Sequence, residues 1–316
     1  MNSLINRLYY LVKPLLPRCV QISLRRIVIR KKRVKYSDVW PISEASKSPP
    51  AGWNGWPEGK KFALVLTHDV ETAKGHEKTE KLMRLEMELG FRSSFNFVPE
   101  RYPVSPVLRS RLIQNGFEVG VHGLKHDGKL YRSEKIFRER ARKINQYLKD
   151  WQAVGFRSPS MQHNLEWIGQ LNIEYDASTF DTDPFEPQSD GVGTIFPFWV
   201  DGTDDRKGYV ELPYTLVQDF TLFILMQQKD IEIWQDKLDW IAENGGMALL
   251  NGHPDYMNFD GSKPGLEEYP AEYYREFLRY VKECYAGQYW SALPREAAQF
   301  FMNEVQKVIY KPTVKS

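Results

Sequence analysis

The alternation of strand-like and helix-like segments constrains the fold of this chain most. Five-residue segments rich in Phe, Val and Leu lie at 62–66, 94–98 and 117–121, a composition typical of strands. The first is apolar throughout, as expected for a strand buried on both faces of a parallel sheet. Helix-like segments separate the three, so this order predicts parallel strands joined by right-handed crossovers.

Capping residues mark the ends of the predicted helices. A helix over about 77–89 ends at Gly90, a residue type favoured at helix C-termini. Ser105 and Pro106 fit the N-cap and the first position of the next helix. A long charged segment over about 133–151 predicts a third helix. We therefore expect an α/β protein.

Candidate chemical groups follow the ends of these strands. His68, Asp69 and Glu71 come soon after the first strand, and His122 follows the third, with His126 four residues later. Because active sites form at the carboxyl ends of the strands in a parallel barrel, we expect these side chains to gather there. Two imidazoles and one carboxylate give three protein ligands for a divalent metal and leave positions open for water and substrate.

The histidines also allow interpretations that involve no metal. Two histidines four residues apart are common in sequences and are weak support for a metal site by themselves. His68 can equally be a packed side chain beside the carboxylates. His76 and His163 have no supporting context, and we interpret both as surface or loop residues.

Five segments in chain order resemble the motifs of one enzyme family. They lie at 67–71, 122–126, 155–159, 175–181 and 249–253. Together they resemble the polysaccharide deacetylases of the NodB-homology group, carbohydrate esterase family 4, over roughly residues 60 to 300. The fourth segment is the weakest match. The resemblance implies a distorted (β/α) barrel of about seven parallel strands, which here follows a basic N-terminal arm.

A metal site is the first implication of this resemblance. The expected ligands are Glu71, His122 and His126, and the expected ion is divalent, with zinc preferred. The chain departs from the family where Val70 replaces a second adjacent aspartate. Alternate residues of an extended strand point to the same side, so Asp69 and Glu71 can share one face. We expect Glu71 to bind the metal and Asp69 to act as base, whereas a competing assignment makes Asp69 the ligand.

Catalytic and substrate-binding residues are the second implication. The expected catalytic residues are Asp69 as general base, Arg157 as its orienting partner and His253 as the acid for the leaving amine. The expected substrate contacts are Leu250, Asp181 and Pro159. Gly123 stands where the family usually has a hydroxyl residue, so a hydrogen bond that supports the metal site can be missing.

Other acidic residues have open assignments. Asp176 and Asp183 lie near Asp181 in a segment that can contact sugar hydroxyls or support His253. Asp183 precedes a proline and fits loop capping instead. Asp255, two residues after His253, can orient that imidazole or belong to an ordinary turn.

Charge is distributed unevenly along the chain. Residues 1–35 hold ten Lys or Arg and no acid, so the remainder has 33 basic and 41 acidic residues, a formal charge of −8. Apolar residues alternate with arginine over residues 20–35, a pattern that favours an amphipathic surface helix. Such a segment can lie on an anionic membrane surface, pack on the acidic barrel or bind RNA weakly. We expect no specific nucleic-acid partner.

The sequence also bears on the cellular compartment. No apolar run reaches the roughly 18 residues of a membrane span, and no signal-peptide core precedes a cleavage site. Two cysteines, Cys19 and Cys284, are too few for a disulfide framework. We expect a cytoplasmic protein that can lie peripherally on the inner face of a membrane.

The resemblance implies a hydrolase that acts on amides of sugars. The expected reaction removes an N-acetyl group from a sugar in a polysaccharide or in a lipid- or nucleotide-linked precursor. Two alternatives remain: a metal-independent cyclic-amide hydrolase of the same fold, and a non-catalytic carbohydrate-binding barrel. We expect an arm and linker at 1–47, the barrel at 48–305 and a tail at 306–316.

Overall fold

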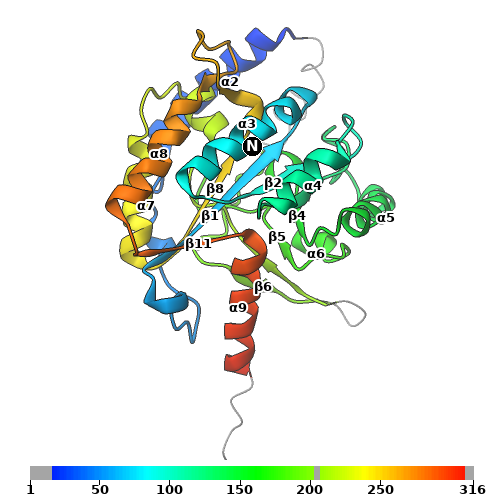
Figure 1. Ribbon diagram of the computed structural model, residues 1–316, viewed down its shortest axis with the longest axis vertical. Helices are drawn as coiled ribbons and strands as arrows, with labels where there is room; N and C mark the ends of the chain where they lie inside the picture. Colours follow the sequence, from blue (N-terminus) through cyan, green and yellow to red (C-terminus); the bar gives the residue numbers. More distant parts are fainter. Residues whose placement is uncertain (1–15, 203–206, 310–316) are drawn as a thin grey trace, which may run out of the picture.

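A curled, mostly parallel sheet organises the molecule (Figure 1). The structure is a computed structural model and describes residues 16–202 and 207–309. Its main sheet contains, within those residues, β1 (Phe62–Val70), β2 (Ser94–Phe97), β3 (Glu118–His122), β4 (Gly155–Arg157), β5 (Tyr175–Asp176), β6 (Phe198–Val200), β7 (Tyr209–Glu211), β8 (Met247–Gly252) and β11 (Tyr289–Ala292). A separate short pair contains β9 (Met257–Asn258) and β10 (Tyr269–Pro270).

Seven parallel strands surround the barrel interior. β1 to β5 pair in sequence order, β5 pairs with β7, and β8 pairs with the other side of β1. A parallel bridge between Leu216 and Leu250 links the chain after β7 to β8. β6 is antiparallel to β7 and lies outside this circuit. The predicted distorted (β/α) barrel is confirmed.

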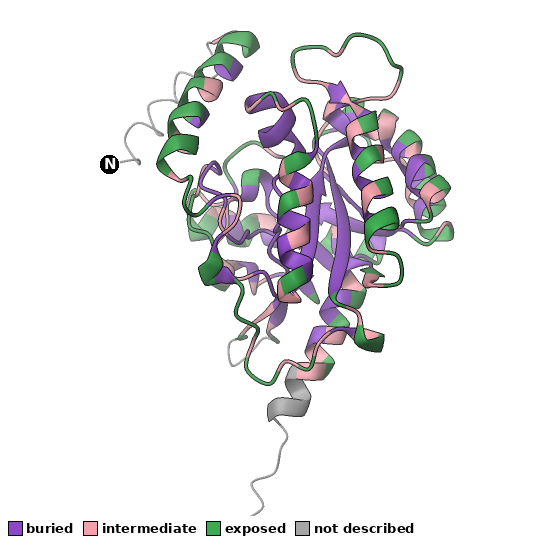
Figure 2. Ribbon diagram, turned by 90° about the vertical axis from the view of Figure 1, so that its left-hand side faces the viewer, coloured by how far each residue is buried: buried purple, intermediate pink, exposed green. Residues whose placement is uncertain are grey.

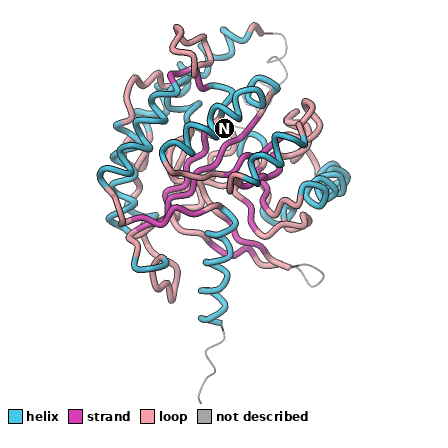
Figure 3. Tube along the Cα trace, in the orientation of Figure 1, coloured by secondary structure: helices cyan, strands magenta, loops and turns pink. Residues whose placement is uncertain are grey.

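Helices pack around the sheet and at its two ends (Figure 3). They are α2 (Arg18–Lys35), α3 (Ala73–Leu89), α4 (Pro106–Gln114), α5 (Glu134–Trp151), α6 (Leu165–Ile168), α7 (Glu232–Asn244), α8 (Ala271–Cys284) and α9 (Pro294–Ile309). The predicted caps are present, because Gly90 ends α3 with φ of 83° and the Ser105 side chain accepts a hydrogen bond from the Leu108 N–H at 3.3 Å.

The faces of β1 alternate between two apolar clusters. Leu64, Leu66 and Val70 belong to the larger cluster, which the covering helices share. Ala63 and Val65 belong to a second cluster that α9 also joins. Since side chains alternate along a strand, Asp69 lies on the face opposite Val70. This alternation directs the carboxylate of Asp69 into the barrel.

α2 packs on the barrel. Its Ile22 and Ile29 side chains are buried, and the Arg18 guanidinium pairs with the Glu267 carboxylate at the barrel surface. Figure 2 shows the helix with a buried stripe and a largely exposed outer face. Figure 1 shows α2 and α9 at opposite ends of the molecule. The predicted amphipathic helix is present, and it contacts the barrel.

Parts of the predicted domain scheme lie outside the described residues, namely 1–15 of the arm and 310–316 of the tail. The domain boundaries at 47/48 and 305/306 stay predictions. Among the described helices, none is both long enough and apolar enough to cross a bilayer.

Candidate active site

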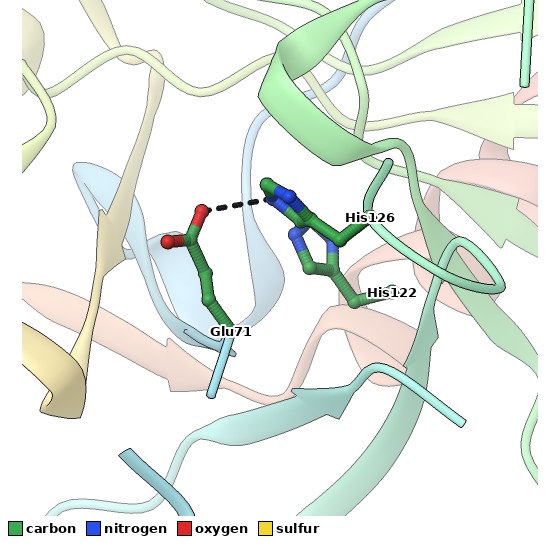
Figure 4. Close-up of side chains that lie close together, drawn as sticks. All are labelled: Glu71, His122 and His126. Atoms are coloured by element: carbon green, nitrogen blue, oxygen red, sulfur yellow. Dashed lines mark ion pairs between the residues drawn. The ribbon is translucent and has the colours of Figure 1, made fainter. Parts of the chain in front are cut away.

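Three side chains with metal-binding chemistry converge where β1 and β3 end. Glu71 directly follows β1, His122 is the last residue of β3, and His126 lies in the following loop. Their ligand atoms all lie within 4.8 Å of one another, and Glu71 Oε1 is 2.9 Å from His126 Nε2. Figure 4 shows the carboxylate facing both imidazoles. These residues can hold a divalent metal, as the sequence predicted.

His122 presents a free nitrogen toward this group. Its Nδ1 lies 3.1 Å from the Arg157 carbonyl oxygen, to which it donates as N–H. The other nitrogen, Nε2, then carries a lone pair, and it is buried without a hydrogen-bond partner among the described residues. Burial lowers the pKa of His122 to about 4, which keeps the imidazole neutral. A neutral imidazole whose second nitrogen is held by a carbonyl is suited to metal binding.

The loop after β3 brings the second imidazole into place. His126 has φ of 53°, in the left-handed region that few residues other than glycine occupy. Its ring centroid lies 5.1 Å from that of His122. Gly123 also has positive φ, 61°, and a Cβ there would lie 2.4 Å from the Pro159 ring. The Pro159 ring therefore explains why a side chain is absent at Gly123.

Glu71 is held from two sides. The Tyr256 hydroxyl donates to Glu71 Oε2 at 2.7 Å, and the Glu71 backbone N–H donates to Asp255 Oδ2 at 2.9 Å. Burial opposes ionisation, but the neighbouring His126 keeps the pKa of Glu71 well below its usual range. The carboxylate is thus ionised, as a metal ligand must be.

Asp69 lies beside the group without belonging to it. Its Oδ1 accepts from Asn96 Nδ2 at 3.0 Å and from Arg157 Nη1 at 3.4 Å, and its Oδ2 accepts from Asn251 Nδ2 at 3.0 Å. Although burial raises the pKa of Asp69, the neighbouring His122 and Arg157 outweigh it and lower that pKa to about 2. This geometry favours Glu71 over Asp69 as the carboxylate ligand.

Arg157 is fully buried and connects several strands. Besides Asp69, it donates at 2.7 Å to Thr67 Oγ1, to Asn251 Oδ1 and to the Ala177 carbonyl. The predicted pairing of Arg157 with Asp69 is therefore present at 3.4 Å. This arginine fixes the carboxylate relative to β1, β4 and β8.

His253, directly after β8, pairs with a residue that the sequence did not indicate. Its Nδ1 lies 2.6 Å from Asp219 Oδ1, and its backbone N–H donates to Asp219 Oδ2 at 2.7 Å. Burial disfavours the charged imidazole, but the Asp219 carboxylate outweighs burial and raises the pKa of His253 to about 10. Asp255 contacts Glu71 and Thr72 instead, so the suggestion that Asp255 orients His253 is wrong.

These groups open into one cavity of about 750 Å³. Asp69, Glu71, His122, His126 and His253 all contribute to its lining. Arg157 is not among the described residues that line the cavity, and it contacts the lining residue Asp69.

The three expected substrate contacts lie elsewhere. Leu250 packs in the larger apolar cluster, Asp181 pairs with Lys237 at 2.5 Å, and Pro159 packs against Gly123. None of the three is among the described residues that line the cavity. Contact between these residues and a substrate stays a prediction.

The remaining histidines and Asp183 have structural partners. His68 is buried against Glu86, with Nε2 2.6 Å from Oε1, which confirms the packed alternative. His76 Nε2 accepts from the Ser105 N–H at 3.1 Å, and His163 Nδ1 lies 3.0 Å from the Met161 carbonyl oxygen. The Asp183 carboxylate accepts from the Phe185 N–H at 2.8 Å, which fits loop capping.

Comparison with known proteins gives a result for structure only. No family model matches the sequence, and neither does any curated protein. A protein described as a polysaccharide deacetylase from Mycobacterium smegmatis has a TM-score of 0.63 and 20% identity, over 82% of this chain and 96% of its own. One described likewise from Pseudomonas aeruginosa PAO1 has a TM-score of 0.62 and 16% identity, over 81% and 95%.

A further similar structure has a different printed activity. Puue allantoinase has a TM-score of 0.62 and 16% identity, over 81% of this chain and 94% of its own. The resemblance that the five motifs predict is confirmed at the level of the fold: the chain has the fold of polysaccharide deacetylases, which that allantoinase shares.

Proposed function

We propose that this protein is a metal-dependent hydrolase that removes the N-acetyl group of a sugar, in a polysaccharide or in a lipid- or nucleotide-linked precursor. One observation carries the proposal: the Glu71, His122 and His126 ligand atoms lie within 4.8 Å of one another in a cavity that Asp69 and His253 also line. A ligand group, an ionised carboxylate and a protonated imidazole in one cavity are the parts that amide hydrolysis needs.

The ligand group suits zinc. Two imidazoles and one carboxylate are a common catalytic zinc set, and the unpartnered Nε2 of His122 faces the other two ligands. A divalent cation there would polarise the amide carbonyl and lower the pKa of the attacking water to about 7.

The side chains of this chain then move two protons. Asp69, ionised and fixed by Arg157, accepts a proton from the water whose oxygen attacks the acetyl carbon. His253, protonated through its pair with Asp219, donates a proton to the sugar nitrogen as the carbon–nitrogen bond breaks. The products are acetate and a free amino sugar, and each proton transfer contributes roughly 10²- to 10⁴-fold in rate.

Acetate release from a panel of N-acetylated sugars tests this function. The wild type should release acetate, whereas Asp69→Asn should lose roughly 10²- to 10⁴-fold in kcat. Asp190→Asn is the matched control because Asp190 is exposed and does not line the cavity. Absence of acetate with every substrate, from metal-loaded wild type, would contradict the proposal.

Two alternatives make different predictions for the same protein. A metal-independent cyclic-amide hydrolase, which Val70 in place of an aspartate keeps open, would retain its activity in chelator. A non-catalytic barrel would bind sugars and release no acetate in any condition. The ligand group after β1 and β3 favours the metal-dependent reaction over both.

We also propose peripheral contact with an anionic, cytoplasmic membrane face. The outer face of α2 exposes Val20, Ile27 and Val34 beside the exposed Arg30 and Lys31. Apolar side chains flanked by cations are typical of helices that lie in the plane of such a surface.

A further inference from the structure

α2 forms one wall of the active-site cavity. The helix contributes to its lining Arg18, Leu24, Arg25, Val28, Ile29 and Lys32. Buried Ile22 and Ile29 anchor it, and the Arg26 guanidinium donates to the Ile224 carbonyl at 2.9 Å. The basic segment is therefore part of the substrate site.

Three cations on the cavity wall form no ion pair with an acid among the described residues, although the charges of Arg25 and Lys32 act to lower the pKa of Glu186 and of Asp183. The Arg25 guanidinium lies over the Phe220 ring, 4.9 Å from its centroid, and Lys32 Nζ donates to the Pro184 carbonyl at 2.7 Å. Arg101, in the loop between β2 and α4, is exposed and lines the same cavity. No ion pair joins any of the three to an acid within residues 16–202 and 207–309.

The acids of the cavity are engaged with other groups. Glu267 pairs with Arg18, and Glu71 with His126. Glu186 accepts hydrogen bonds from Gln218 at 2.6 Å and from Tyr214 at 3.1 Å. Burial and the neighbouring Asp183 raise the pKa of Glu186 to about 8, while the charge of Arg25 acts in the opposite direction. The wall formed by α2 is left with positive charge.

We propose that Arg25 and Lys32, together with Arg101, bind a phosphate or diphosphate group attached to the N-acetylated sugar. The substrate is then an anionic sugar phosphate and not a neutral polymer. Arg25 and Lys32 are seven residues apart and so lie on one face of the helix. Guanidinium and ammonium groups bind phosphate oxygens through charge-assisted hydrogen bonds. This inference rests on the proposed deacetylase function and specifies its substrate class.

The group beyond the phosphate can be a nucleoside or a prenyl chain. Leu24 and Val28 line the cavity on the same helix and are 42% and 53% exposed. Apolar side chains beside the cations can contact either group. Both kinds of substrate carry the phosphate, and the experiment below distinguishes the nucleoside from the prenyl chain.

The test compares two N-acetylglucosamine derivatives that differ in charge, the 1-phosphate and the neutral methyl glycoside. The wild type should have a kcat/KM at least about tenfold higher for the 1-phosphate, because the neutral methyl glycoside cannot form the charge-assisted contacts. Arg25→Gln/Lys32→Gln should raise KM about tenfold for the phosphate alone, at unchanged kcat. Arg142→Gln/Lys149→Gln is the matched control, because these two cations are also seven residues apart but are exposed on α5 and do not line the cavity, and it should change kcat/KM for neither substrate.

A charge-conserving variant and a binding measurement complete the test. Arg25→Lys/Lys32→Arg keeps both positive charges and should keep the preference for the phosphate. This result would distinguish loss of charge from misfolding as the cause of the higher KM in Arg25→Gln/Lys32→Gln. Calorimetric binding of inorganic diphosphate to metal-loaded protein should weaken about tenfold in Arg25→Gln/Lys32→Gln and not in the control. Uridine diphosphate N-acetylglucosamine and farnesyl diphosphate N-acetylglucosamine then identify the source of the phosphate.

Equal kcat/KM for the two derivatives in the wild type would overturn the phosphate site while acetate release upheld the proposed function. An equal loss for both derivatives in Arg25→Gln/Lys32→Gln would overturn it too. If no substrate of the panel, these two derivatives included, releases acetate, the proposed function fails, and the diphosphate titration still decides on the anion site. Equal diphosphate affinity in all variants would overturn that site.

Discussion

The side chain at position 70 decides how the carboxylates of the site are arranged. Val70 points into the larger apolar cluster, so Asp69 and Glu71 on either side of it can face the cavity. The sequence predicted this arrangement because alternation along a strand is local. Asp219 could not be predicted, since it lies 34 residues before His253 and belongs to no recognisable motif. Contacts across such distances depend on how the loops fold over the barrel.

Asp69 and Glu71 are expected to differ in metal retention. Glu71→Gln should lower metal occupancy together with activity, because it removes one of three protein ligands. Asp69→Asn should keep the metal and lose turnover, because the base acts on water. Metal analysis of the purified variants measures the difference. Loss of metal in Asp69→Asn, with full retention in Glu71→Gln, would reverse the two assignments.

Asp219 is expected to set the alkaline limit of activity. The pKa of His253 is raised to about 10, so the acid form of this imidazole persists below that pH and is lost above it. Stability from the pair is likewise complete below a pH of about 6.5 and is lost as pH rises through 10. Asp219→Asn should move the alkaline limb of the kcat profile down by about one to three pH units. An unchanged profile would show that the pair does not control the acid.

At the scale of helices and loops, local sequence patterns predicted where helices begin and end, but they did not predict what each helix packs against. The caps of α3 and α4 lie where the sequence placed them, because capping depends on neighbouring residues. The position of α2 over the active site could not be predicted, since amphipathicity does not identify the surface that a helix covers. Asp181 illustrates the same limit: its partner Lys237 lies on α7, 56 residues away.

Asp181 is expected to act on stability. Asp181→Asn leaves the buried Lys237 ammonium without its carboxylate and should reduce the free energy of unfolding by about 3–5 kcal/mol. Urea denaturation measures this, with Asp236→Asn, at an exposed position beside Lys237, as the control. A rise in KM with unchanged stability would instead support the sequence prediction that Asp181 contacts substrate.

At the scale of the whole molecule, the order of the elements predicted the barrel and the active-site end. β1, β2 and β3 were recognisable because each is a short segment rich in apolar residues. β4, β5 and β7 have only two or three residues each, too few for a periodic pattern. The bridge between Leu216 and Leu250 is likewise a product of the folded barrel. The number of strands therefore came from the family resemblance.

Membrane contact is expected to depend on the outer face of α2. Arg30→Gln/Lys31→Gln should reduce co-sedimentation with anionic vesicles, since each basic residue near such a surface contributes about 1 kcal/mol. Acetate release from a soluble substrate should not change, because neither residue lines the cavity. Vesicle binding that is unaffected by the substitutions and by high salt would exclude this surface as the contact.

The dependence of acetate release on bound metal tests the central claim most directly. Protein stripped of metal by a chelator is titrated with zinc while bound metal and acetate release from an N-acetylated sugar phosphate are measured together. We predict no activity without metal and a rise in activity that saturates at one ion per chain, with both signals reduced in His122→Ala and retained in the control His163→Gln. Full acetate release from the metal-free protein would contradict the account.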